Sequence, residues 1–150
     1  MPFWGNMSFN EVEFKKIIPS DDKDMIGHVN HSKYLQYLEE ARWSLYKFYG
    51  YDEVDVATDE KGPIVLEANI YYRKEIFPGE EVKIISRFNG FRGFIGSMDQ
   101  RILNSNQKVA CRASIRFAYF DLKERKMLLP FGKWKKVHEK LLGGNNSNLV

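Results

Sequence analysis

The sequence predicts a single α+β domain, in which an antiparallel sheet of about five strands curls around one long central helix. One strong helical pattern lies between residues 30 and 50, and four strand patterns with a period of two follow it from Gly62 onward. The loops between these strands are too short for the crossover that parallel neighbours need. With 150 residues and 43% hydrophobic content, the chain can bury one core. We expect one domain over residues 1–142 and a disordered tail over residues 143–150.

The first elements expected are a strand and the long helix. Residues 9–18 partly alternate apolar and polar side chains, and Pro19 with the aspartates after it ends this pattern. Asn30 is well suited to cap the helix, because its side-chain oxygen can accept from the free N–H groups of the first turn. Gly50 lies where the helix should end. The apolar positions of its buried face recur at spacings of three and four: Tyr34, Leu38, Ala41, Leu45 and Phe48.

Residues 51–61 are acidic and predict an irregular connection before the strands. Turns are expected at Pro78–Gly79 and at residues 104–106, and a short final helix is expected over residues 130–142. Each of the four strands should bury one face. The positions assigned to these faces are Ile64, Leu66, Ala68, Ile70 and Tyr72; Val82, Ile84 and Phe88; Phe94, Met98 and Ile102; and Val109, Cys111, Ala113, Ile115, Phe117 and Tyr119.

Composition limits the classes of protein and partner. The one cysteine, Cys111, excludes a disulfide within the chain and a site with several thiolates, and we interpret it as a small buried hydrophobe. The start, MPFWGNMSFNE, lacks a signal-peptide pattern, and no stretch has the length of a membrane span, so we expect a cytoplasmic protein without membrane insertion. Residues 1–75 hold 9 basic and 14 acidic side chains, whereas residues 76–150 hold 14 and 6. The basic half suits an anionic partner, although solvated strand faces explain most of these residues.

The stretch from Asp22 to Tyr34, DKDMIGHVNHSKY, concentrates ionisable groups at the start of the long helix. It joins two acids, a glycine, two histidines and the capping asparagine. The free N–H groups at a helix N-terminus carry partial positive charge and can stabilise an oxyanion. A carboxylate beside them can attack a carbonyl group or activate water to do so. The stretch therefore predicts a catalytic site, with Asp24 as the carboxylate and the start of the helix as its electrophilic partner.

These residues resemble the hot-dog fold thioesterases of the 4-hydroxybenzoyl-CoA thioesterase family. The match rests on DKDMIGHVNHSKYL, on the Glu-Ala-Arg of residues 40–42, on the strand start at residues 63–65, on the Pro78–Gly79 turn and on the Leu129–Pro130 ending. The resemblance implies an acyl-CoA thioesterase that hydrolyses a thioester to a carboxylic acid and coenzyme A. It implies no cofactor beyond the coenzyme A of the substrate. A homodimer or homotetramer is expected, because a curved sheet has exposed edges that invite pairing.

By this resemblance, Asp24 is the catalytic carboxylate and acts as a nucleophile or as a general base. His31 opens the helix and contributes its backbone N–H to the thioester carbonyl. His28 is expected to hold the loop through its ring nitrogens and, with Asn30, to border the substrate. We expect no metal site, because His28 precedes the helix and the third histidine, His138, lies far along the chain.

The remaining expected site residues are distant in the sequence. Lys61 and Gly62 lie in the loop before the second strand, which in the family supplies a second donor, often across the dimer interface. Arg92 and Gly93 match a basic segment that contacts the nucleotide in some relatives, and the phosphates of coenzyme A need such partners. An acidic acyl carrier protein would use the same basic surface.

Other functions stay open from the sequence. One is a carrier-protein thioesterase, and another is a hot-dog hydratase or dehydratase, which would pair a loop aspartate with a histidine, as Asp24 and His28 could. The hydratase signature, however, includes a proline before the histidine, which is missing here. A non-catalytic domain could bind acyl ligands or nucleic acid. Nucleic acid is not expected, because the aromatic positions alternate away from Arg112 and Arg116 instead of lying beside them.

Overall fold

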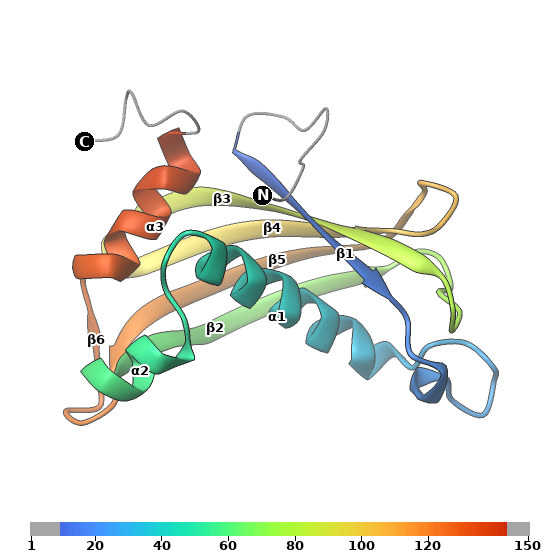
Figure 1. Ribbon diagram of the computed structural model, residues 1–150, viewed down its shortest axis with the longest axis horizontal. Coiled ribbons are helices and arrows are strands. Elements are labelled where there is room, and N and C mark those ends of the chain that lie inside the picture. Colours follow the sequence, from blue (N-terminus) through green and yellow to red (C-terminus); the bar gives the residue numbers. More distant parts are fainter. Residues whose placement is uncertain (1–9, 144–150) are drawn as a thin grey trace.

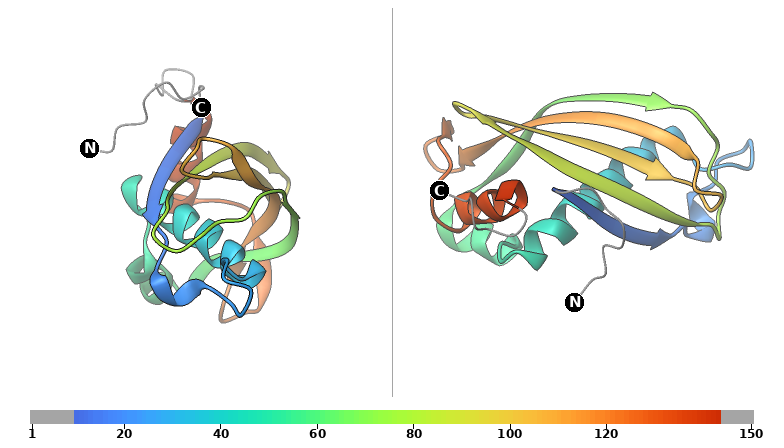
Figure 2. Two further views of the ribbon diagram at one scale, coloured as in Figure 1. Left: turned by 90° about the vertical axis from the view of Figure 1, so that its right-hand side faces the viewer. Right: turned by 90° about the horizontal axis from the view of Figure 1, so that it is seen from above.

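The computed structural model describes residues 10–143. One antiparallel sheet has the strand order β1-β3-β4-β5-β2, and the short β6 pairs with β5. Helix α1 lies across one face of the sheet (Figure 1), and the strands curve around it (Figure 2). The predicted α+β plan is confirmed. The elements are β1 (Glu11–Ile17), η1 (Ser20–Asp22), α1 (His31–Phe48), α2 (Glu53–Asp59), β2 (Lys61–Tyr72), β3 (Glu81–Arg92), β4 (Ile95–Leu103), β5 (Val109–Asp121), β6 (Lys126–Leu128) and α3 (Gly132–Gly143).

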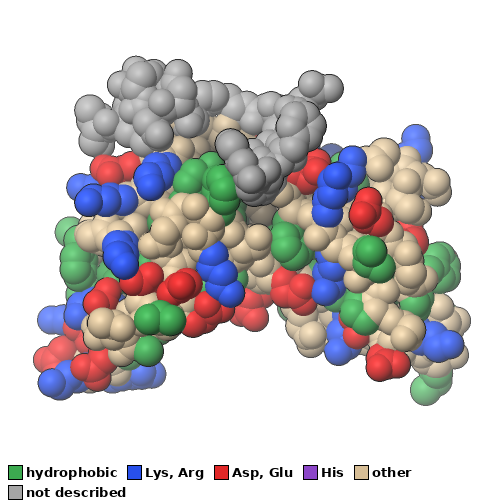
Figure 3. Space-filling model, viewed as in Figure 1, with side chains coloured by type: hydrophobic (Ala, Val, Ile, Leu, Met, Phe, Trp, Pro, Cys, Tyr) green, Lys and Arg blue, Asp and Glu red, His purple; other side chains and the backbone are tan. Residues whose placement is uncertain are grey.

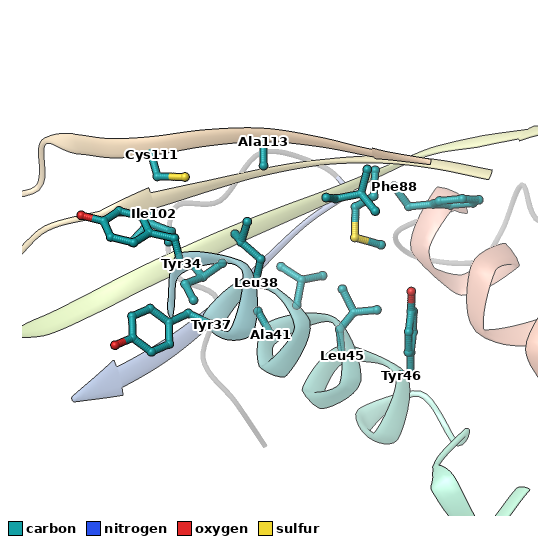
Figure 4. Close-up of a cluster of buried hydrophobic side chains, with 14 of the residues drawn as sticks. Tyr34, Tyr37, Leu38, Ala41, Leu45, Tyr46, Phe88, Ile102, Cys111 and Ala113 are labelled. Atoms are coloured by element: carbon teal, nitrogen blue, oxygen red, sulfur yellow. The ribbon is translucent and has the colours of Figure 1, made fainter. Parts of the chain in front are cut away.

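Helix α1 begins and ends close to the predicted residues. The Asn30 side chain accepts a hydrogen bond from the N–H of Ser32 at 3.0 Å, and Gly50 follows the helix with a φ of 104°, which favours glycine. Phe48 is 40% exposed, so its assignment to the buried face is wrong. Tyr46 is buried in the last turn instead and contacts α3. The side chains of α1 that point into the sheet (Figure 4) include Tyr34, Tyr37, Leu38, Ala41, Leu45 and Tyr46.

The inner face of the sheet largely follows the predicted alternation. Arg112 and Arg116 point outward on β5, between core residues of the same strand. Phe94 is the exception, because it lies in the turn before β4 and is 43% exposed. A buried aliphatic or aromatic side chain contributes about 1.5–3 kcal/mol to folding. The buried positions confirmed on β3, β4 and β5 are Val82, Ile84, Phe88, Met98, Ile102, Cys111, Ala113, Ile115, Phe117 and Tyr119.

A buried polar network interrupts this apolar face under the middle of α1. The side-chain amide of Gln100 donates to the Leu38 carbonyl at 3.0 Å and to Ser86 Oγ at 2.9 Å. Its oxygen accepts from Nη1 of Arg42 at 2.9 Å. Buried polar atoms are tolerated when they are paired in this way. The network therefore ties one turn of α1 to one position on the sheet.

Strand β2 is an open edge of the sheet and departs from the predicted pattern. A β-bulge inserts Leu66 between Val65 and Glu67. The alternation reverses at the bulge, so Ile64 does not share the face predicted for it with Ala68, Ile70 and Tyr72. The strand leaves several large apolar side chains exposed within one chain, namely Val65, Leu66, Tyr71 and Tyr72.

Two boundaries differ from the expectation. Residues 53–59 form helix α2 where an irregular segment was predicted, because Asp52 and Asp55 make a reciprocal capping box. Gly143, assigned to the disordered tail, is the last residue of α3. The rest of that predicted tail, residues 144–150, lies outside the described residues.

Helix α3 closes one end of the sheet with an aromatic cluster. Trp134 and His138 are at most 1% exposed, and the His138 ring lies 4.5 Å from Phe88 and 5.7 Å from Phe117 between centroids. Burial lowers the pKa of His138 to about 4, against a smaller opposite effect of its hydrogen bond to the Trp134 carbonyl. His138 is therefore a neutral core residue at pH 7.

We predict that His138 makes the protein sensitive to acid. Its pKa is about 4 in the folded protein and about 6.5 in an unfolded chain. The unfolded chain binds the proton first as pH falls, so the free energy of unfolding should drop between pH 6.5 and 4 by up to about 3 kcal/mol. Urea unfolding across this range measures the slope. His138→Phe should flatten it, whereas the loop control His28→Gln should keep the larger part of it; equal slopes in wild type and His138→Phe would contradict the assignment.

Candidate active site

The loop before α1 is a tight turn that presents one carboxylate. A β-bridge between Lys23 and Val29 closes it, and the N–H of Asp24 donates to the His28 carbonyl at 2.9 Å. The N–H of Gly27 donates back to the Asp24 carbonyl at 3.0 Å, and Gly27 has a φ of 96°, which disfavours other residues. The backbone thus fixes Asp24 at the base of the turn.

Two further contacts anchor the turn to the helix and the sheet. The Tyr37 hydroxyl of α1 donates to Oδ2 of Asp22 at 2.6 Å, and the N–H of Val29 donates to the Ile76 carbonyl at 2.9 Å. Burial, and then the Asp22 carboxylate, raise the pKa of Tyr37, so its hydroxyl stays a donor. Asp22 therefore has a structural role, and Asp24 is the candidate catalytic carboxylate of the turn.

The two carboxylate oxygens of Asp24 have different surroundings. Oδ1 accepts the N–H of Ile26 at 2.8 Å. Oδ2 lies 3.4 Å from the Asn30 amide nitrogen and 3.6 Å from Nε2 of His28. The Asp24 side chain is 21% exposed, so it is reachable yet partly shielded from water. Oδ2 is therefore the oxygen available to a substrate.

The first turn of α1 supplies a donor beside this carboxylate. Asn30 accepts the N–H groups of Ser32, through its side chain, and of Lys33, through its carbonyl. Within residues 10–143, the N–H of His31 makes no hydrogen bond, as expected for the first residue of a helix. A free amide with the partial positive charge of the helix end can polarise a carbonyl oxygen.

Asp24, His28 and His31 line the same pocket, which has a volume of about 370 Å³. Tyr34 and Tyr72 form its aromatic wall, with ring centroids 5.1 Å apart. The Tyr72 hydroxyl donates to the His31 carbonyl at 3.2 Å. Burial raises the pKa of Tyr34 to about 12, so this wall stays uncharged. The pocket therefore combines one carboxylate with an apolar surface for an organic group.

Sequence reasoning missed Glu75 at this site. Oε2 of Glu75 lies 2.8 Å from Nδ1 of His28, although the two residues are 47 positions apart. Glu75 follows β2, and the antiparallel course of the sheet carries it back to the turn. No local spacing could reveal this pair, because the contact depends on the length of β2.

The other predicted site residues lie at the opposite end of the sheet. Lys61 and Gly62 begin β2, whereas the pocket lies where β2 ends, about 36 Å away at 3.3 Å per residue. Arg92 pairs with Ile95 in the turn that contains Gly93, at the same far end as Lys61. Within one chain, these four residues are therefore not part of the Asp24 pocket.

The described residues hold no group of three or more His, Cys, Asp or Glu side chains arranged to bind a metal ion. His138 lies in the α3 cluster, apart from His28 and His31. In residues 10–143, none of the helices has the length and apolar character needed to cross a membrane.

The antiparallel sheet curled around a single central helix is the hot-dog fold. The sequence profile of the Thioesterase-like superfamily matches residues 18–141. The chain therefore belongs to this superfamily and is a thioester hydrolase. The predicted hot-dog fold is confirmed.

Individual relatives agree with this family. The chain is 30% identical over 124 residues to the long-chain acyl-CoA thioesterase FadM of Escherichia coli K12, with 79% of this chain and 90% of FadM covered. The structure of YbaW, a probable thioesterase from Escherichia coli, is similar at 27% identity and a TM-score of 0.70, covering 88% and 98%. A DHNA-CoA thioesterase from Staphylococcus aureus shares the fold, with 20% identity, a TM-score of 0.81 and coverage of 93% and 96%. These relatives do not single out the 4-hydroxybenzoyl-CoA branch.

We predict that Asn30 stabilises the start of α1. Asn30→Ala removes the side-chain acceptor of the Ser32 N–H and should lower the free energy of unfolding by about 1 kcal/mol. Asn30→Ser keeps a capping oxygen and should cost only a few tenths of that amount. Urea denaturation of the three proteins is the measurement. Equal stability of Asn30→Ala and wild type would show that the Asn30 cap does not contribute to the free energy of unfolding.

Proposed function

We propose that the protein is an acyl-CoA thioesterase, which hydrolyses a thioester to a free carboxylic acid and coenzyme A. One observation carries this proposal: Asp24 and His31, the residue at the start of α1, line the same aromatic-walled pocket. The family membership and the acyl-CoA substrate of the relative FadM support it. The narrower resemblance to 4-hydroxybenzoyl-CoA thioesterases stays a prediction for the acyl group, since aromatic and long-chain substrates both occur in the superfamily neighbours' names.

The chemistry follows from the two groups. As the carbonyl carbon becomes tetrahedral, negative charge grows on its oxygen, and the N–H of His31 with the helix dipole stabilises it. Asp24 supplies the other half, either by attacking the carbonyl directly or by taking a proton from the attacking water. In both cases the Ile26 N–H holds Oδ1 while Oδ2 faces the substrate.

A second copy of the chain would complete the site. If the free edges of two β2 strands pair antiparallel around a two-fold axis, the Lys61 end of one strand lies beside the Tyr72 end of the other. Lys61 and Gly62 of the partner subunit would then border the Asp24 pocket. The exposed apolar side chains of β2 support this arrangement, because pairing would remove them from water.

Such a dimer also suits the phosphates of coenzyme A. Arg92 and Arg116 line a hollow of about 530 Å³ at the far end of each sheet, and Gly93 lies in the adjoining turn. Arginine forks pair well with phosphate oxygens. An acidic carrier protein could use the same basic end, but not the face in Figure 3 where acidic side chains gather over α1 and α2. The exposed acids of α1 and α2 include Glu39, Glu40 and Glu53.

We predict that Asp24→Asn abolishes thioester hydrolysis while the fold survives. Asparagine keeps the size and the Ile26 hydrogen bond but can neither attack nor accept a proton, so kcat should fall at least about 100-fold. Thiol release from short, long, branched and aromatic acyl-CoAs measures turnover. Thermal unfolding checks the fold.

The matched control is Asp21→Asn, because Asp21 is an exposed acid in the same loop. It should keep turnover within about twofold, as surface substitutions usually do. Near-normal turnover by Asp24→Asn would end this mechanism. If the wild type hydrolysed none of the acyl-CoAs, the result would point instead to a carrier-protein thioester as substrate or to a binding role.

We also predict that the free edge of β2 forms the dimer. Replacing Val65 and Leu66 together by glutamate places like charges across the proposed interface and should give a monomer with little activity. Light scattering after gel filtration measures the mass. The control Ile17→Glu changes an apolar residue that is 66% exposed on β1, the other edge, and should leave the mass unchanged. A β2 variant that stays dimeric would exclude this interface.

A further inference from the structure

His28 lies between two carboxylates that come from different parts of the chain. Its Nδ1 is 2.8 Å from Oε2 of Glu75, and its Nε2 is 3.6 Å from Oδ2 of Asp24. The side chains of His28 and Asp24 are 28% and 21% exposed, and all three residues line the pocket. Glu75 itself is 59% exposed, so it can change without leaving a hole in the core. We call these three residues the Asp24–His28–Glu75 chain.

Glu75 decides which nitrogen of His28 carries a proton. An ionised carboxylate only accepts hydrogen bonds, so Nδ1 of His28 must donate its hydrogen to Glu75. When the imidazole is neutral, its lone pair is then on Nε2. That nitrogen is the one that faces Asp24. Without Glu75, the two tautomers would compete.

Asp24 offers only one oxygen to His28. The Ile26 N–H holds Oδ1 at 2.8 Å, while the hydrogen bond that Oδ2 accepts within residues 10–143 is the long 3.4 Å contact with the Asn30 amide. The gap of 3.6 Å between Oδ2 and Nε2 is longer than a hydrogen bond, and catalytic hydrogen bonds commonly tighten when substrate binds. The lone pair of His28 is thus aimed at the reactive oxygen.

We propose that His28 receives and returns the proton of the thioester reaction, and that Glu75 is the positioning residue that keeps Nε2 of His28 facing Asp24. The proposal rests on the proposed thioesterase function and assigns Asp24 the role of general base. Water attacks the carbonyl carbon, a C–O bond forms, and one water proton passes to Oδ2 of Asp24. That proton moves on to Nε2 of His28, whose positive charge then lies between two carboxylates.

The second half of the reaction returns the proton. The C–S bond breaks, and its electron pair stays on sulfur as a thiolate. Nε2 of His28 donates its proton to that sulfur, which gives the thiol and the carboxylic acid. His28 is then neutral again, with its Nδ1 hydrogen still held by Glu75. Atoms and charge balance with water as the only added reactant.

A purely structural role for Glu75, in which it only holds the loop through His28, would not require its negative charge. Any acceptor at position 75 could hold Nδ1–H, and a glutamine amide oxygen would serve as well as a carboxylate. The proton path needs the negative charge, because Glu75 stabilises the imidazolium that exists between the attack of water and the protonation of the sulfur. Glutamine and alanine at position 75 therefore separate the two roles.

The experiment compares wild type, Glu75→Gln and Glu75→Ala in thiol release from the acyl-CoA that the wild type hydrolyses fastest. Glu75→Ala should lower kcat about 10- to 100-fold and Glu75→Gln about three- to tenfold, with KM within about twofold, since only the transition state changes. Glu81→Ala, an exposed glutamate at the start of β3, is the control and should match wild type. Full activity of Glu75→Gln, or a loss expressed only in KM, would overturn the proposal in favour of a brace.

Nitrogen NMR of the imidazole rings supplies a readout that is independent of turnover. The chain has three histidines, so His28→Gln identifies the His28 signals by their loss. Wild type should show His28 with hydrogen on Nδ1 at neutral imidazole, and Glu75→Ala should show the Nε2–H tautomer appearing. An Nε2–H tautomer in wild type would overturn the proposal even with thioesterase activity intact. A wild type inactive toward all thioesters would instead remove the proposed function, and this proton path with it.

Discussion

The candidate site depends on how the N-terminus of α1 packs against the end of the sheet. The N–H of Val29 bonds to the Ile76 carbonyl, and the Tyr37 hydroxyl bonds to Asp22, so the turn is held from both the sheet and the helix. The Gln100 network fixes the same helix further along. Because the helix cannot slide along the sheet without breaking buried hydrogen bonds, the free N–H of His31 and the Asp24 carboxylate keep one relative position.

Because the sheet curves around α1, the Asp24 pocket and the free edge strand β2 lie at the border of the sheet. Among the described residues, the core fills the concave face under α1, and the Asp24 pocket lies beside the start of the helix, where β2 ends at Tyr72. The same edge strand carries exposed apolar side chains and a bulge at Leu66, which bends it. In the proposed dimer, the Asp24 pocket and the subunit interface would use neighbouring parts of β2, and the candidate site would lie between two chains.

Periodicity predicted the helix and the strands, whereas the cluster of ionisable groups before the helix and the family resemblance singled out the Asp24 loop. Asn30 signals a cap, and β5 alternates between buried and more exposed positions from Cys111 to Phe117. The bulge at Leu66 was missed. An extra residue changes how β2 pairs with β5, but it leaves no mark in the spacing of apolar residues in the sequence. Helix α2 was missed, although the spacing of Asp52 and Asp55 in the sequence is that of a capping box. Glu75 was missed for a different reason: its contact with His28 exists only once the sheet has folded. The distant site residues Lys61 and Arg92 stay predictions that depend on a second chain.

The central claim is that the thioester carbonyl binds between the N-terminus of α1 and Asp24, in a site that a second subunit completes. A crystal structure of the Asp24→Asn protein with an unhydrolysed acyl-CoA tests it most directly. The account predicts the carbonyl oxygen about 3 Å from the backbone nitrogen of His31, with Lys61 and Gly62 of the partner subunit on its other side. A thioester bound away from the start of α1, or enclosed within a single chain, would contradict it.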